Sequence, residues 1–169
     1  MESFLNSVDL ESGLDDLDSP VRFKGWLTAH RRVAAGDTLT EADLAFARDL
    51  RDALRAQLRT HNGEQNQESP DRVRLDALAA QVTLRVRVTP DGVWLQPAES
   101  GVRGVLGEVL GAMVLAERDG TWHRLKICRE DGCQLAFYDQ SKNSSRTWCS
   151  MSACGNRNKT RAYRGRQRS

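Results

Sequence analysis

The chain has 169 residues, of which 39% are hydrophobic and 28% are charged, with a formal net charge of +2. This composition is ordinary for a globular protein, and the chain is long enough to bury a core without disulfides. No apolar run approaches the ~20 residues of a membrane-spanning helix, and the acidic N-terminal segment lacks the basic start of a secretory signal. We therefore expect a cytoplasmic protein whose cysteines are reduced and available for a metal.

The small net charge hides a strong asymmetry along the chain. Residues 122–169 carry eleven Lys or Arg against three acids, a charge of +8, whereas residues 1–121 carry 14 basic and 20 acidic residues, a charge of −6. Such an imbalance is typical of a polyanion-binding end joined to a different module. We predict two domains, 1–121 and 122–169.

Three helices are predicted in the first eighty residues. Ser19 at the N-cap and Pro20 at the first helical position predict a helix over about 20–36. Thr40 and Asp43 form a capping box ahead of a second helix that reaches about residue 60. The third helix runs over 70–79, after a polar loop.

From Val82 onward the apolar residues alternate, which predicts a half-buried strand over 82–88. A Pro-Asp-Gly turn leads to a second strand at 93–95, giving a hairpin. An apolar helix follows over 101–117, with glycines spaced to form a smooth packing strip. The short stretch at 4–9 is expected to be a strand or turn. Large aromatic side chains expected in the core are Trp26, Phe46 and Trp94.

No catalytic constellation is evident before residue 121. His30 and His61 lie far from any cysteine, and no zinc-protease motif is present. The simplest interpretation is that both are ordinary surface histidines, and we do not predict an enzyme.

The four cysteines form two equally spaced pairs, CREDGC and CSMSAC, with fifteen residues between the pairs. Two such pairs can place four thiolates around one tetrahedral Zn²⁺, leaving no open position for catalysis. Two disulfides are the alternative, which the expected compartment disfavours. We predict one structural zinc held by Cys128, Cys133, Cys149 and Cys154.

The predicted finger has treble-clef architecture. A strand leads into Cys128, and a tight turn follows in which Gly132 supplies a positive φ. A hairpin is expected to pair 134–138 with 145–148, and a helix capped by Ser150 or Ser152 carries Cys154 in its first turn. The apolar residues of this segment are too few to hold it, so zinc binding and folding should be coupled. The predicted fold class is α+β: a mainly helical N-terminal domain with a β-hairpin, and a treble-clef-like zinc finger.

The last helix is strongly basic, with no acid after Gly155. Arginines recur at steps of four, three and four along one helical stripe. Their planar forks suit phosphates and guanine edges. Residues predicted to bind nucleic acid are Lys142, Arg146, Arg157, Lys159, Arg161, Arg164, Arg166 and Arg168. Two alternatives are that the helix docks on the acidic domain or on a partner protein, and that Asn156 and Arg157 have a structural task.

Several motifs in this segment resemble the CGNR zinc finger family: Trp148-Cys149, Cys154-Gly-Asn-Arg157, Lys159 and Tyr163-Arg-x-Arg166. The upstream part, with Leu5-Asn6 and Trp26-Leu27, is similar to bacterial proteins with an ABATE domain, described as stress-induced transcription regulators. The resemblance implies a DNA-binding role.

Our hypothesis is a cytoplasmic bacterial regulator that contacts duplex DNA chiefly through phosphates. Its N-terminal domain would sense an unknown small-molecule effector or mediate oligomerisation, and a homodimer is expected if the sites are specific. The alternatives are an RNA- or ribosome-associated zinc protein, and a small-molecule-binding protein or enzyme whose finger is purely structural.

Overall fold

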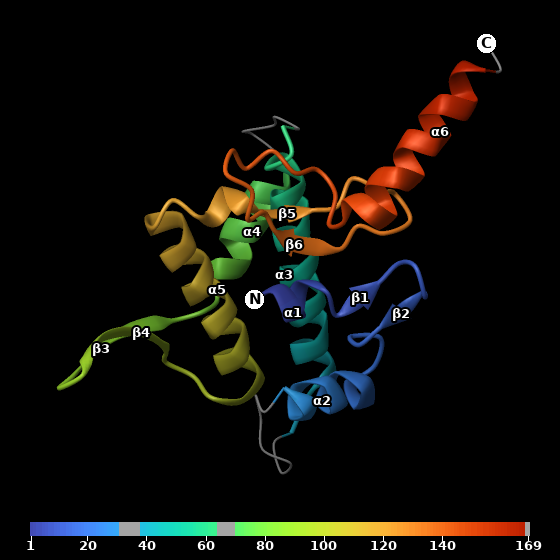
Figure 1. Ribbon diagram of the computed structural model, residues 1–169. Coiled ribbons are helices and arrows are strands. Elements are labelled where there is room, and N and C mark those ends of the chain that lie inside the picture. The colour runs from blue at the N-terminus through green and yellow to red at the C-terminus, as the bar shows by residue number, and fades with distance from the viewer. Residues whose placement is uncertain (31–37, 64–69, 168–169) are drawn as a thin grey trace.

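The computed structural model describes residues 1–30, 38–63 and 70–167 (Figure 1). In chain order its elements are α1 (Glu2–Leu5), β1 (Val8–Asp9), β2 (Leu14–Asp15), α2 (Pro20–Ala29), α3 (Glu41–Thr60), α4 (Pro70–Ala79), β3 (Leu84–Thr89), β4 (Gly92–Pro97), α5 (Gly101–Arg118), the 3-10 helix η1 (Trp122–Arg124), β5 (Leu125–Ile127), β6 (Ala136–Tyr138), the π-helical turn η2 (Met151–Gly155) and α6 (Asn156–Arg166).

Helices dominate the described residues, and the strands form three separate antiparallel pairs, β1–β2, β3–β4 and β5–β6. This arrangement confirms the α+β class. Of the helices in the described ranges, none combines the length and the apolar character needed to span a membrane.

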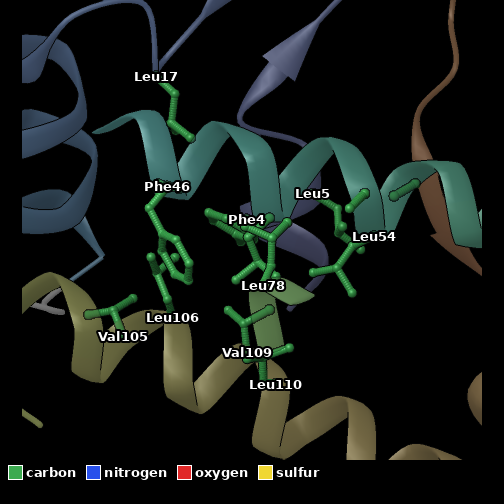
Figure 2. Packing of buried hydrophobic residues seen from close by; sticks show 14 of the residues in the cluster. Phe4, Leu5, Leu17, Phe46, Leu54, Leu78, Val105, Leu106, Val109 and Leu110 are labelled. Carbon is green, nitrogen blue, oxygen red and sulfur yellow. The ribbon is translucent and has the colours of Figure 1, made fainter. Parts of the chain in front are cut away.

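Helix α3 runs through the middle of the body and carries one face of the core (Figure 1). It begins where the sequence predicts, because the Thr40 side chain accepts a hydrogen bond from the Asp43 backbone N–H while the Asp43 carboxylate accepts from the Thr40 N–H, at 3.1 and 3.0 Å. Figure 2 shows Phe46 and Leu54 of α3 facing Leu106 and Val109 of α5. Burying each such side chain contributes about 1.5–3 kcal/mol.

Helix α5 packs closely on the β3–β4 hairpin through the predicted glycine strip. A Cβ added at Gly107 would lie 2.9 Å from the Cβ of Pro97. A Cβ added at Gly111 would lie 3.8 Å from the Leu95 side chain. In the hairpin, Val86 pairs with Leu95.

The outer part of this hairpin extends away from the body (Figure 1). The prediction of a half-buried strand is therefore wrong there, since Val86 and Val88 are 67% and 77% exposed. Trp94, expected in the core, is also exposed, and its indole N–H donates to Thr89 Oγ1 at 3.2 Å. By contrast, the predicted burial of Trp26 and Phe46 is confirmed.

Two further expectations are changed at the N-terminal side. The stretch at 4–9 begins inside helix α1 and enters a strand only at Val8. Helix α2 ends at Ala29, where His30 stacks on Trp26 with ring centroids 4.2 Å apart. The predicted stop near Gly36 lies outside the described residues, as does most of the predicted polar loop.

The first strands of the finger share the core of the upstream helices. Trp122, Leu125 and Ile127 belong to the same buried cluster as the α3 and α5 side chains. Asn6 pairs with the Ala136 backbone, donating to its carbonyl at 2.9 Å and accepting from its N–H at 2.8 Å. The predicted domain division at residue 121 stays a prediction, and the apolar packing is continuous across it.

A buried arginine adds a second link across this division. Arg55 on α3 donates to the carbonyls of Leu5 and Gln134, both at 2.8 Å. Burial and the nearby Arg59 and Arg51 lower the pKa of Arg55 to about 10, so it remains charged at neutral pH. A charged donor between two carbonyls fixes α1 and the finger against α3.

Candidate zinc centre and basic helix

The first cysteine pair is positioned by β5 and β6. Cys128 directly follows β5, and its N–H donates to the Leu135 carbonyl at 2.9 Å, which continues the β5–β6 pairing past the last strand residue. The predicted hairpin between 134–138 and 145–148 is therefore wrong, since β6 pairs with β5. The positive φ expected at Gly132 is found at Gln134 instead, where φ is 46°.

The second cysteine pair sits at the entry to α6. Ser150 caps the turn η2, as predicted, by accepting from the Ala153 N–H at 3.3 Å. Cys154 is buried within that turn, directly ahead of α6. Gly155 lies close to Met151, since a Cβ at this position would be 2.8 Å from the Met151 sulfur.

The four cysteine sulfurs converge on one point, all within 4.8 Å of one another. Cys133 and Cys154 each lie 3.7 Å, sulfur to sulfur, from Cys149. A disulfide is excluded at that separation, since its bond is about 2.05 Å. Four Zn–S bonds of about 2.3 Å in a tetrahedron would place the sulfurs about 3.8 Å apart. The cluster therefore fits one structural Zn²⁺, with every coordination position filled by the chain.

Without a cation, the Cys133 and Cys149 thiols would resist ionisation. Burial and the nearby Cys128 sulfur raise the pKa of the Cys133 thiol to about 11, and burial also raises the pKa of Cys149. Burial acts in the same direction on Cys154, but a hydrogen bond from Arg157 outweighs it and lowers that pKa. Because the Cys133 and Cys149 thiols resist ionisation by themselves, a divalent cation favours their thiolate forms, which supports a coupling of metal binding to folding.

Arg157 connects the zinc site to the N-terminal part of the chain. One end of its guanidinium donates to the Cys154 sulfur at 3.3 Å, and the other donates to Glu11 Oε1 at 2.7 Å. Glu11 lies in the β1–β2 turn. The nearby Asn156 donates to the Ser152 carbonyl at 3.1 Å. Both residues thus make contacts within the fold, the structural alternative that the sequence left open.

Glu130, in the turn between the first two cysteines, holds the start of α6. Its carboxylate is almost fully buried and accepts from Arg161 at 2.6 Å and from Asn158. The bond from Arg161 lowers the pKa of Glu130. The first two turns of α6 are thereby fixed to the finger, and Arg161 is already paired.

Arg146 also has a partner inside the finger. Its guanidinium donates to the Cys149 carbonyl and lies over the Phe137 ring, 5.3 Å from the centroid. This arrangement supports the loop that carries the third cysteine.

The rest of α6 projects from the body, with the C-terminus at its far end (Figure 1). None of its residues is buried. Four of the predicted nucleic-acid residues are exposed, and their side chains have no hydrogen-bond or ion-pair partner in the part of the chain that the structure describes: Lys142, Lys159, Arg164 and Arg166. Arg168 lies outside the described residues.

Sequence reasoning missed the two acids that engage this helix. Glu130 lies between the first two cysteines, so the predicted zinc site already placed it near the start of α6. Glu11 is 146 residues from Arg157, and no local pattern points to that contact.

Residues 2–119 match the family ABATE, described as "Putative stress-induced transcription regulator". The chain belongs to the ABATE family. Residues 124–167 match the CGNR zinc finger. Both descriptions are regulatory or structural rather than enzymatic. Among curated proteins, none matches the chain.

Membership of the ABATE family with a CGNR finger accords with the geometry of the finger. The four residues of the CGNR motif have separate tasks here: Cys154 supplies a sulfur, Gly155 permits the close approach of Met151, Asn156 bonds the preceding turn, and Arg157 contacts the Cys154 sulfur. The motif thus joins the zinc site to the base of α6.

Proposed function

We propose that this protein is a cytoplasmic DNA-binding transcription regulator in which the zinc finger holds α6 away from the body to contact duplex DNA. The observation that carries the proposal is that α6 has no buried residue and bears Lys159, Arg164 and Arg166, none of which has a partner among the described residues. This helix contributes nothing to a core, and all of its charged residues are basic. Both features favour a function outside the fold.

The dimensions of α6 suit a DNA groove. Its eleven residues extend about 16 Å at 1.5 Å per residue, and the major groove, about 12 Å wide, admits one helix. Phosphate contacts supply most of the affinity in such complexes. One helix of this length binds weakly, so we include a homodimer in the proposal.

The free charges set the expected salt dependence. Lys142, Lys159, Arg164 and Arg166 could neutralise four phosphates, which corresponds to a slope of about −3.6 for log K against log salt. Arg146, Arg157 and Arg161 are not included because their guanidinium groups are engaged within the fold.

The test is a salt titration of duplex binding, followed by fluorescence anisotropy, with a charge-reversed protein. Lys159→Glu, Arg164→Glu and Arg166→Glu together should reduce the slope by about three, since each lost phosphate contact reduces it by about one. Zinc content should stay at one per chain. Arg161→Glu is not a clean substitute, because it also breaks the contact with Glu130.

A matched control applies the same charge change elsewhere: Arg22→Glu, Arg85→Glu and Arg87→Glu, at exposed positions on α2 and the β3–β4 hairpin. The control should bind as the parent does. The proposal fails if the α6 variant keeps its affinity, or if the control loses as much. Tighter binding of structured RNA than of duplex DNA would favour the RNA-associated alternative instead. Sequencing the DNA recovered with the protein from cells would then identify its sites.

A further inference from the structure

A cleft of about 720 Å³ lies where α3, α4 and α5 meet η1. In Figure 1, α4 and α5 lie to the left of the central α3, whereas α6 projects to the upper right. The volume falls within the range of small-molecule sites, about 300–1,000 Å³. Most residues that line the cleft lie within the ABATE match, 2–119, whereas Gly120, Trp122 and His123 lie between that match and the finger match, which begins at residue 124.

The inner wall of the cleft is apolar and aromatic. Leu75 and Trp122 are buried in it, and Met113 is half-buried. The His61 ring lies edge-on to the Trp122 ring, with centroids 5.4 Å apart. His61 Nδ1 donates to the Leu125 carbonyl at 2.8 Å, which fixes the ring orientation. Burial lowers the pKa of His61, so this wall is uncharged at neutral pH.

The rim of the cleft is charged and mainly basic. Arg72, Arg118 and His123 line it, together with the single carboxylate of Glu117. All four residues are exposed, and none of their side chains has a hydrogen-bond or ion-pair partner within residues 1–30, 38–63 and 70–167. Two guanidinium groups against one carboxylate leave the rim cationic above an apolar wall.

We propose that this cleft binds a small amphipathic organic anion. A flat apolar body fits the wall of Leu75, Met113 and Trp122, while a carboxylate or similar group meets Arg72 and Arg118. Guanidinium groups suit this task because they hold planar oxyanions through paired hydrogen bonds. Convergent polar groups over an apolar wall are the usual composition of such sites.

The location gives the ligand a role if the protein regulates transcription, which is the part of this inference that rests on the proposed function. Trp122 and His123 open the segment that becomes β5 and ends in Cys128. An occupant would therefore touch both α5 and the chain that leads into the zinc site. Binding itself does not require that the protein contact DNA.

The probe is 2-naphthoate, with 2-naphthamide as its neutral counterpart of the same shape. Titration into the full-length, zinc-loaded protein is followed by NMR, where the Trp122 indole signal reports on the cleft. We expect saturable binding of one naphthoate per chain with a dissociation constant below about 1 mM, and at least tenfold weaker binding of the amide. Absence of saturable naphthoate binding, or equal binding of the two probes, would overturn the proposal.

Two variants locate the site. Arg72→Glu with Arg118→Glu should abolish naphthoate binding, while Arg85→Glu with Arg87→Glu on the hairpin should leave it unchanged. Val114→Trp keeps the rim charges but fills the cleft from a position that is 43% exposed, and it should also block binding. Retained binding in either cleft variant refutes the site. The α6 charge-reversal protein should bind naphthoate normally, so loss of DNA binding and loss of ligand binding are separable results.

Discussion

Asp139→Asn tests the most deeply buried ion pair of the finger. The Asp139 side chain is fully buried and that of Lys126 is 4% exposed, with their charged groups 2.9 Å apart. Asp139 also accepts from the N–H groups of Ser141 and Arg146, at 2.9 and 2.8 Å. Burial by itself would raise the pKa of Asp139, but the bonds from Ser141 and Lys126 lower it well below the ordinary value.

The asparagine side chain keeps an acceptor oxygen but removes the charge that balances Lys126. Leaving one member of a buried pair uncompensated costs about 3–5 kcal/mol. For a domain of this size, that corresponds to a melting temperature lower by roughly 6–20 °C. Calorimetry on the zinc-loaded protein measures the shift, and Asp91→Asn, the same change in an exposed turn, should have almost no effect.

A second substitution separates charge imbalance from lost packing. Lys126→Met combined with Asp139→Asn removes both charges, and we expect this double variant to be about 1–3 kcal/mol more stable than Asp139→Asn alone. The reasoning is refuted if Asp139→Asn lies within 1 kcal/mol of the parent, or if the second substitution only adds further destabilisation.

Three other predictions concern the remaining contacts. Removing zinc with a chelator should unfold the loops that carry the cysteines, while β5 and β6 stay packed on the main core. Cys133→Ser should leave less than one zinc per chain by metal analysis. Cysteine loops that stay folded without metal would contradict the coupling. Gly107→Ala should destabilise the protein by about 1–3 kcal/mol, because the added Cβ would lie 2.9 Å from Pro97. Gly25→Ala in α2, where an added Cβ has no neighbour within 4 Å, should stabilise the protein by up to about 1 kcal/mol. Equal effects of the two substitutions in denaturant titrations would exclude the packing argument. Burial opposes ionisation of Asp15, but paired hydrogen bonds from Arg51 outweigh it and lower the Asp15 pKa. The Asp15–Arg51 pair therefore stabilises the folded protein above the unfolded pKa of about 4, and this contribution is lost as the pH falls through the lowered pKa of the folded state. Asp15→Asn should therefore be less stable than the parent near pH 6 and approach it in acid, and a gap independent of pH would count against the pair.

The zinc site could be predicted because its information is local. Each cysteine pair is brought together by one short loop, and a single tetrahedral Zn²⁺ needs both pairs as ligands. The predicted strand pairing in the finger is wrong because an alternating pattern indicates a strand but not the strand it pairs with. The sequence alone therefore does not show that 136–138 pairs with 125–127 rather than with 145–148.

Long-range partners explain the other differences. Alternation in 82–88 indicates an apolar face, but whether anything covers that face depends on how far α5 extends beside it, which is why Val86 and Val88 are exposed. Arg157, Arg161 and Arg164 of the predicted stripe lie on α6, and Arg168 lies outside the described residues. Which of the three are paired depends on Glu11 and Glu130. Local sequence sets charge, and only the folded chain determines which charges are already neutralised.

The core that continues from α3 into Ile127 has a consequence for protein engineering. The finger cannot be transferred to another protein by itself, because Asn6, Arg55 and the shared core hold it in place as well as zinc. A chimera that carried only residues 122–166 would expose Trp122 and Leu125 to water, because the upstream helices that bury them would be missing. A successful graft would have to bring α1 and the C-terminal half of α3 with it, and the direction in which α6 points would be inherited from that support.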